Sequence, residues 1–537
     1  MATQWSTFPI EFKGGLISNL SALQHGTNAV GSATILQNFE PNKEGGYSKI
    51  KGHAKFSDTQ VPGSDLVLAL KVISSGRIIT ARKNATNHTE YFVGTGSTWT
   101  SIGASAATNG LKVRHAEFNL DGDDKVIFVD GVNFPAIYNT SGNSLTFLTS
   151  ADSTDVQGAE HVAFFNNKAF YSKGNVLYFS SSFTVDNFHP SGDPGNLNIG
   201  SDITGLAVFR DQLIIFTTDS IKRLTGRTST DYNLTSITDR SGCINGDTIQ
   251  EVGGDIMYLA PDGIRLLSAT DRIGDFGLDV ASDTIAKDAN TFLNSTASFS
   301  SVLFREKAQY RIFAYINSEQ KTVAKGLIAT KFIAQGASGI AWATTKGIKA
   351  YVADSRYSGD QETIAFANED GYVYILNTGN DQDGEEIEAI YESPFMPISD
   401  PQVRKTFYKM TLYAEPTGSM DLNINLKYDF ASGTNTKKVQ PDTINIGSTG
   451  SSVFLFGSSN ANFAQADSNN ATQVDTSWSL YDSTKSYASY GGELDNVYNS
   501  NVIGSGKTVA LRIEDNSTNP TFTLDTALLE FRQNDRQ

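Results

Sequence analysis

The chain has 537 residues, of which 39% are hydrophobic, 11% are aromatic and 19% are charged. This apolar content excludes a disordered chain, and a single cysteine, Cys243, excludes an internal disulfide or a thiolate zinc site. The 42 basic and 58 acidic residues give a formal net charge of −16, which disfavours a protein that grips nucleic acid by neutralising its phosphates.

Residues 1–62 are predicted to form an extended N-terminal segment with tight turns. Residues 1–9 lack a basic region followed by an apolar run, so no signal peptide is expected. No apolar stretch approaches the roughly 18 residues of a membrane-spanning helix.

Residues 63–385 alternate short apolar segments with turn residues. In one unit, the apolar residues 126–129 are followed by Asp130-Gly131 and then by a second apolar segment. Such dipeptides supply the positive φ that tight hairpins need. Comparable turns recur roughly every 44 residues, at Asn87, Gly131, Gly174, Asp219, Gly263 and Lys307, and a seventh follows at Asp370-Gly371.

A period of about 40–50 residues with about four strands is typical of a β-propeller. We therefore predict six or seven blades over residues 63–385, although an irregular series of hairpins in one or two sandwiches is the alternative. Residues 280–293 are predicted to be a short helix capped by Ser282. Residues 344–357 are interpreted as an insertion before the last blade.

Residues 386–537 have a different texture. Apolar and polar side chains alternate strictly over residues 420–428, which indicates a strand with one wet face. We predict a C-terminal β-sandwich. Its Ser/Asn/Gly-rich insertion, around residues 447–505, is either a surface loop or a segment that gates a channel.

No catalytic, cofactor or metal site is predicted, and the chain is not expected to be an enzyme. Residues 121–124 and 381–386 are acidic, but neither follows the regular calcium loop, so solvated turns are the better interpretation. His161 and His189 lack metal-ligand spacing, and Cys243 has no histidine nearby in the sequence.

The first 56 residues carry a family resemblance. The segments that carry it are residues 12–18 with Lys13-Gly14-Gly15, residues 38–41, and residues 45–52 with Gly45-Gly46-Tyr47. A strand entry with Arg404-Lys405 and the tail at 529–535 add to it. These features resemble phage tail nozzle proteins, also described as tail tubular protein B or packaged-DNA stabilisation proteins of short-tailed phages.

The resemblance implies a structural virion protein, assembled in the host cytoplasm. Such a protein would form a ring, commonly a homohexamer, that contacts adaptor or portal-proximal tail proteins and tail fibres, and residues 1–62 would dock to the ring or adaptor. DNA would pass through the channel without specific binding, and the ring would retain the packaged genome until ejection. Two alternatives are a receptor- or glycan-binding propeller, with aromatics repeated in each blade, and a glycan-cleaving propeller, with carboxylates converging on the axis.

Overall fold

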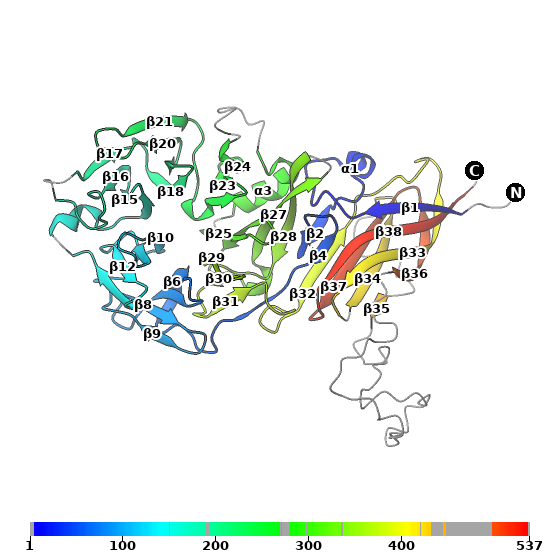
Figure 1. The fold of residues 1–537 in the computed structure, drawn as a ribbon. Coiled ribbons are helices and arrows are strands. Elements are labelled where there is room, and N and C mark those ends of the chain that lie inside the picture. The colour runs from blue at the N-terminus through cyan, green and yellow to red at the C-terminus, as the bar shows by residue number, and fades with distance from the viewer. Residues whose placement is uncertain are drawn as a thin grey trace, which may run out of the picture.

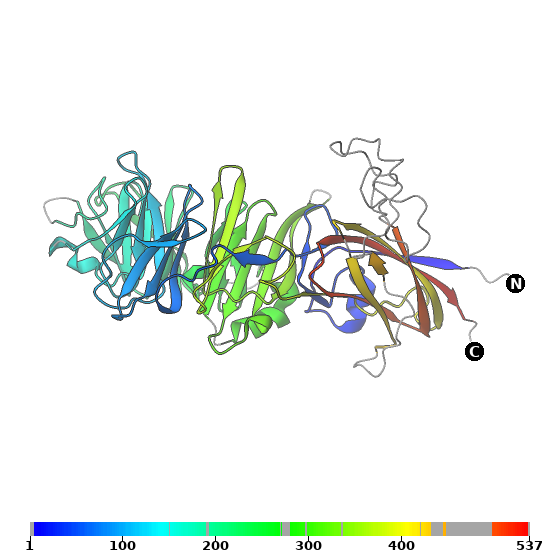
Figure 2. The ribbon, with the colours of Figure 1, turned by 90° about the horizontal axis from the view of Figure 1, so that it is seen from below.

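The fold consists of two all-β domains side by side in an elongated molecule (Figures 1 and 2). The description rests on a computed structural model. It covers residues 5–534 except 150, 190–192, 269, 271–279, 296–297, 335–336, 419, 431–443 and 447–496. The predicted all-β class, with a propeller followed by a sandwich, is confirmed.

The propeller has seven blades in the described part of the chain. The first three are β6–β9 (Ser64–Val72, Ile78–Lys83, Thr89–Gly94, Trp99–Ser101), β10–β13 (Arg114–Phe118, Lys125–Val129, Ala136–Asn139, Ser144–Phe147) and β14–β17 (His161–Phe165, Lys168–Lys173, Val176–Phe179, Gly195–Asn198). The fourth is β18–β21 (Ile203–Phe209, Gln212–Thr217, Ile221–Thr225, Asn233–Thr238), and the fifth is β22–β24 (Gln250–Val252, Asp255–Ala260, Gly263–Leu266). The sixth is β25–β28 (Ser298–Phe304, Gln309–Tyr315, Lys325–Ala334, Ala337–Lys346), and the seventh is β29–β31 (Val352–Ser358, Gln361–Ala367, Val373–Leu376) with β5 (His53–Lys55).

The blades stand in a closed ring, with the first strand of each blade at the centre (Figure 1). The last inner strand, β29, lies against the first, β6. Strand β5 comes from the N-terminal segment and pairs with β31. The seventh blade therefore combines a strand that precedes the first blade in sequence with the last three strands of the propeller. This pairing closes the ring.

The predicted hairpins all form, but one of them joins a different pair of strands in its blade. The turns at 87, 131, 174, 219, 263 and 370–371 join the second and third strands of their blades, whereas Lys307 joins the first and second strands of blade six. The extra chain between blades five and six holds η3 (Asp283–Ile285) and α3 (Ala286–Leu293). That extra length shifts the 44-residue period by one strand.

Two local predictions need correction. The helix over 280–293 forms only from residue 283, and the Ser282 hydroxyl accepts a hydrogen bond from Ile264 N at 3.0 Å instead of capping it. Residues 344–357 are not an insertion, because they end the long strand β28 and begin β29. Both differences come from tertiary pairing that local patterns do not encode.

The sandwich combines both ends of the chain. One sheet contains β3 (Phe39–Pro41), β4 (Tyr47–Lys49), β38 (Phe522–Gln533), β33 (Lys405–Pro416), β36 (Val497–Gly506) and β1 (Ser6–Glu11), which pairs with β38. The other contains β2 (Ile35–Gln37), β32 (Ile387–Glu392), β37 (Val509–Ser517), β34 (Met420–Tyr428) and β35 (Ile444–Ile446). The second sheet continues through a parallel contact between β2 and β28 into blade six, so nine strands link the domains.

The N-terminal segment, residues 1–62, is thus part of both domains of its own chain. It contributes strands to the sandwich, the short helix α1 (Ala22–Asn28) and the closing strand of the propeller. Its expected docking to a ring or adaptor stays a prediction. The predicted boundaries at 62 and 385 therefore separate segments of the sequence. They do not separate the two folded domains, because the N-terminal segment contributes strands to both.

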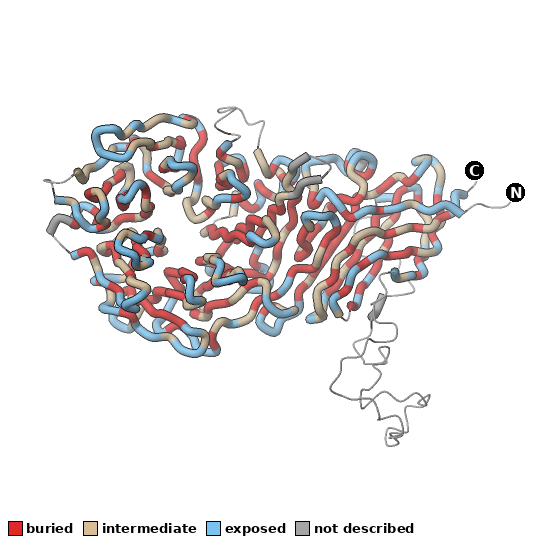
Figure 3. The backbone as a smooth tube through the Cα atoms, viewed as in Figure 1, coloured by how far each residue is buried: buried red, intermediate tan, exposed pale blue. Residues whose placement is uncertain are grey.

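The buried residues form one large core that runs from the sandwich into blade six, and smaller cores lie between the other blades (Figure 3). The strict alternation in β34 follows the prediction, since every second residue from Met420 to Tyr428 is buried and the residues between them are not. Most of the predicted insertion at 447–505 lies outside the described residues, and residues 497–505 belong to β36. None of the described helices is long and apolar enough to cross a membrane.

Candidate functional site

The motif residues of the N-terminal segment meet at the junction of the two domains. Gly15 and Tyr47 are 32 positions apart, and Gly15 N donates a hydrogen bond to Tyr47 Oη at 2.9 Å. The same hydroxyl donates to Gly31 O at 3.0 Å. Tyr47 is fully buried. We call Gly15, Gly31, Gly46, Tyr47 and Trp342 the junction cluster.

All three glycines of the junction cluster lack room for a side chain, including Gly31, where a Cβ would overlap Glu11 O. Gly15 has φ +70°, and a Cβ there would lie 2.8 Å from both N and O of Trp342, which belongs to blade six. Gly46 has φ +79°, and its Cβ would lie 2.9 Å from Leu524 O in β38. Both values of φ favour glycine. The Gly-Gly motifs therefore allow the N-terminal segment to pass close to the backbone of both domains.

The remaining motif residues differ in their surroundings. Lys13 is exposed and pairs with Glu11, while Gly14 and Gly45 also have positive φ. Lys405 is buried and donates to the carbonyl oxygens of Asp400 and Lys507.

Strand register separates Arg404 and Lys405 from the junction cluster. On β38, Lys405 pairs with Gln533 and Tyr47 pairs with Leu524. At roughly 3.3 Å per residue, these positions are about 30 Å apart. Arg404 binds Ser505 O and the carboxylate of Asp429 at that far end. The structure therefore brings together the two N-terminal motifs and leaves the basic pair apart.

A cleft of about 790 Å³ lies beside the junction cluster. The motif residues Lys13, Gly45 and Gly46 line it. Its other charged lining residues have both signs and include Glu40, Lys43, Lys51, Lys307, Glu415 and Asp525. The cleft is thus a polar hollow where the sandwich meets blade six.

The buried acid Glu40 is the most strongly held charge of the cleft. Its carboxylate accepts from Lys307 Nζ at 2.6 Å and from Arg311 Nη2 at 2.5 Å. Burial by itself would raise the pKa of Glu40, but Arg311 and Lys307 together hold it below its ordinary value. Glu40 and Arg311 are each at least nine-tenths buried. This ion pair ties β3 to blade six.

A second buried pair joins β4 to β37. Lys49 Nζ lies 3.2 Å from Asp515 Oδ2, and both side chains are fully buried. Burial lowers the pKa of Lys49 and raises that of Asp515. Because desolvation opposes both charges, the pair specifies position more than it adds stability.

Asp525 is a half-buried acid that lines the cleft. No hydrogen bond or ion pair to its carboxylate is recorded among the described residues. Burial, together with the nearby charge of Glu415, raises its pKa. Asp525 and Glu415 therefore form an acidic part of the cleft that would attract a cation.

Neither Cys243 nor the close pair of His25 and Ser32 forms an accessible nucleophilic site. Burial raises the pKa of Cys243 to about 12, so its thiol is not activated. His25 Nε2 lies 2.7 Å from Ser32 Oγ, a contact that the sequence analysis missed and that no spacing rule would find. Both side chains are only 2% exposed, and a substrate could not reach them.

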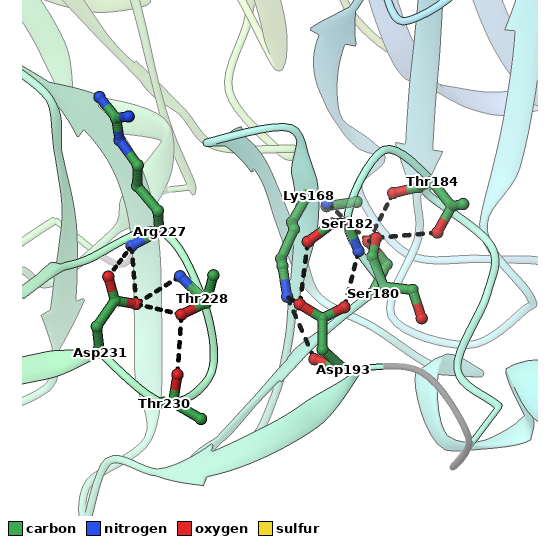
Figure 4. Close-up of polar contacts among 11 residues, drawn as sticks. Lys168, Ser180, Ser182, Thr184, Asp193, Arg227, Thr228, Thr230 and Asp231 are labelled. Atoms are coloured by element: carbon green, nitrogen blue, oxygen red, sulfur yellow. Dashed lines mark hydrogen bonds and ion pairs between the residues drawn. The ribbon is translucent and has the colours of Figure 1, made fainter.

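A buried lysine at the edge of blade three also serves the fold. Lys168 Nζ lies 2.6 Å from Asp193 Oδ2, and Ser182 N donates to the same carboxylate at 3.0 Å (Figure 4). Burial would raise the pKa of Asp193, but these partners lower it to about 2. Lys168 also lies over the ring of Tyr232 from blade four. Its charge therefore holds neighbouring blades together and is not available for chemistry.

The acidic turns considered for calcium have protein partners. Asp121 pairs with Lys125, and Asp124 accepts from Asn119 Nδ2 at 3.0 Å. Asp383 lies 3.2 Å from Lys55 Nζ. Among the described residues, no group of three or more His, Cys, Asp or Glu side chains could hold a metal ion.

Comparisons with known proteins give a likeness of fold only. No family model and no curated protein matches the chain. Similar solved structures include an extracellular domain from B. thetaiotaomicron, solved once as part of a one component system and once as part of a hybrid two component system. The identities are 11% and 10%, and the TM-scores are 0.39 and 0.38. The matches cover 71% and 69% of this chain and 44% of each of those chains, less than half of their length.

Proposed function

We propose that this chain is a non-catalytic structural subunit of a phage tail, of the nozzle type. In this role it forms a ring, a homohexamer, around the DNA channel, retains the packaged genome and allows its ejection. The observation that carries the proposal is the junction cluster. Two of the motifs that carry the family resemblance meet in one buried site that joins the two domains, although Gly15 and Tyr47 are 32 positions apart.

The continuous sheet between the two domains suits a subunit that must resist mechanical force. Blade six and the sandwich share one nine-stranded sheet, and the N-terminal segment crosses the junction to close the propeller. A force between the domains would therefore act on several hydrogen-bonded strands and on the buried pair of Glu40 and Arg311. A channel subunit experiences such a force when pressurised DNA pushes on its ring.

The cleft supplies a place for a neighbouring subunit or adaptor. Its lining carries the exposed bases Lys43 and Lys51 and the acids Glu415 and Asp525. Charges of both signs at one surface set the register of a partner through complementary pairs. The expected contact with a ring neighbour or adaptor is thus assigned to this cleft.

Passage of DNA makes a separate demand on the surface. Each contact between a basic side chain and a phosphate would add a salt-sensitive interaction that slows sliding. The net charge of −16 fits a channel wall if the acidic residues face the lumen. We expect a lumen more negative than the outer wall, and a continuous basic lumen in the assembled ring would contradict this expectation.

The alternative of a glycan-binding surface built from repeated aromatics has less support. Among the described blade residues, the exposed large aromatic side chains are Phe183 and Tyr357. Phe183 follows the third strand of blade three, whereas Tyr357 lies in the first strand of blade seven. These positions are not equivalent, so they do not form a repeated platform.

The proposal is tested by the assembly state of the purified chain. We expect light scattering after gel filtration, together with electron microscopy, to show closed rings. The double variant Lys43→Glu/Lys51→Glu should reduce ring formation, whereas Lys125→Glu, at the start of β11 in blade two, should not. A chain that remains monomeric at high concentration and is absent from tail preparations would exclude the proposal.

A further inference from the structure

All seven blades contribute to one cavity on the propeller axis. Its volume is about 200 Å³. It lies among the inner strands, and its lining runs from Leu70 of blade one to Asp354 of blade seven. A cavity of this size is smaller than the roughly 300–1,000 Å³ of pockets for drug-sized ligands, so it suits a ligand of one sugar ring or less.

A charged cluster forms one wall of the cavity. Arg114 Nε donates to Asp247 Oδ1 at 2.8 Å and Arg114 Nη2 donates to Asp247 Oδ2 at 3.1 Å. Lys112 Nζ lies 3.1 Å from Asp247 Oδ2 and donates to Phe299 O at 2.9 Å. These bonds fix all three charged side chains in place before any ligand arrives.

Arg114 keeps donors for a ligand. A guanidinium has five N–H groups. Its recorded bonds use Nε, one hydrogen of Nη2 toward Asp247 and one hydrogen of Nη1 toward Glu160 O at 3.2 Å. One hydrogen therefore remains on each terminal nitrogen. Two such donors from one guanidinium match a carboxylate.

His161 is a buried polar group that lines the same cavity. His161 is only 7% exposed, and no hydrogen bond to its imidazole is recorded among the described residues. Burial, followed by the charge of Arg114, lowers its pKa to about 3, so the ring is neutral. A neutral imidazole has one donor and one acceptor, which is the pattern that a hydroxyl group can satisfy.

The charges of the wall leave an excess of one cation. Lys112 and Arg114 face the single anion Asp247, and His161 adds no charge. The neighbouring group of charges is balanced, because Lys71 lies 3.1 Å from Asp354 and 2.7 Å from Glu117, and Glu117 also pairs with Arg356. In a chain of net charge −16, this local excess favours a ligand with one negative charge. A phosphate monoester, with a charge near −2, would be repelled by Asp247.

We propose that the axial cavity binds a small hydroxylated carboxylate, of the class of a uronic acid monosaccharide. The ligand carboxylate would accept the remaining N–H groups of Arg114, and a ring hydroxyl would bond to His161. The inference goes beyond the structural role proposed above and does not rest on it. It gives the propeller a binding site that a purely mechanical part would not need.

The test is saturation-transfer NMR with the full chain and millimolar glucuronate, with glucose as the matched neutral sugar. We expect transfer to glucuronate and none to glucose. Arg114→Gln should weaken binding about tenfold or more, because it removes a charge-assisted pair. Lys125→Gln, far from the axis, should leave binding unchanged.

His161→Gln keeps the test decisive if Arg114→Gln does not fold, because no hydrogen bond to the His161 imidazole is recorded among the described residues. We expect it to fold and to bind glucuronate several-fold more weakly. No transfer to glucuronate, equal transfer to glucose, or unchanged binding by His161→Gln would overturn the proposal. Displacement of glucuronate by a lower concentration of inorganic phosphate would overturn the assignment of the ligand class.

Discussion

The hydroxyl of Tyr47 offers the sharpest test of the junction cluster. The substitution Tyr47→Phe keeps the ring and its packing but removes the oxygen that bonds to Gly15 N and Gly31 O. Both backbone groups lie in a fully buried site where the Tyr47 side chain shields them from water. The variant therefore leaves the Gly15 N–H without a partner, whereas Gly31 O keeps the hydrogen bond that it accepts from Lys13 N at 3.2 Å.

The expected loss follows from the Gly15 N–H. Leaving a buried backbone group without its hydrogen bond costs about 1–3 kcal/mol. Relaxation of the surrounding chain would offset part of that loss, so we expect the free energy of unfolding to fall by about 1–2 kcal/mol. The effect should appear in the transition that involves the sandwich and blade six, because the cluster joins them.

Urea denaturation followed by tryptophan fluorescence measures this change, since Trp342 belongs to the cluster. Tyr408→Phe is the matched control, because Tyr408 is 40% exposed and has no recorded hydrogen bond. We expect the control to change stability by less than about 0.5 kcal/mol. Equal midpoints for the two variants would refute the argument that the Tyr47 hydroxyl stabilises the junction.

Three further predictions concern buried charges and the thiol. Arg311→Met should lower the free energy of unfolding by about 3–5 kcal/mol, because Glu40 loses its buried partner; the double variant with Glu40→Gln should recover part of that loss in urea titrations. Burial and the charge of Glu415 raise the folded-state pKa of Asp525, so stability is lost as pH rises above the unfolded value of about 4. Asp525→Asn should therefore stabilise the protein at neutral pH and have no effect near pH 3, and an equal effect at both pH values would contradict this. Cys243, with a pKa of about 12, should react with a thiol reagent at neutral pH only at the rate at which the blades open, and fast labelling of the native protein would disprove its burial.

The propeller could be predicted because its turns are local. Asp130-Gly131 and its relatives fix a hairpin within a few residues, and their spacing fixes the repeat. The prediction lost register at Lys307 because the chain between blades five and six contains α3. A spacing argument measures chain length and does not identify which strand of a blade it has reached.

The sites could not be predicted in the same way. Gly15 and Tyr47 were selected as motif residues, but only the fold shows that one donates a hydrogen bond to the other. His161 shows the same limit, because an isolated histidine reveals no site until seven blades place it beside Arg114 and Asp247. In both cases the chemistry depends on contacts between distant segments, which residue spacing does not report.

The order of strands has a consequence for assembly. Strand β1 pairs with β38, and β5 pairs with β31, so neither domain is finished until segments hundreds of residues apart have met. Contacts of such long sequence separation form slowly. The cleft beside the junction cluster exists only when both β4 and β38 are in place, because it is lined by Gly46 and Asp525 together. A partner that docks in this cleft would therefore select chains whose two domains are already joined, and would not recognise a propeller or a sandwich that had formed alone.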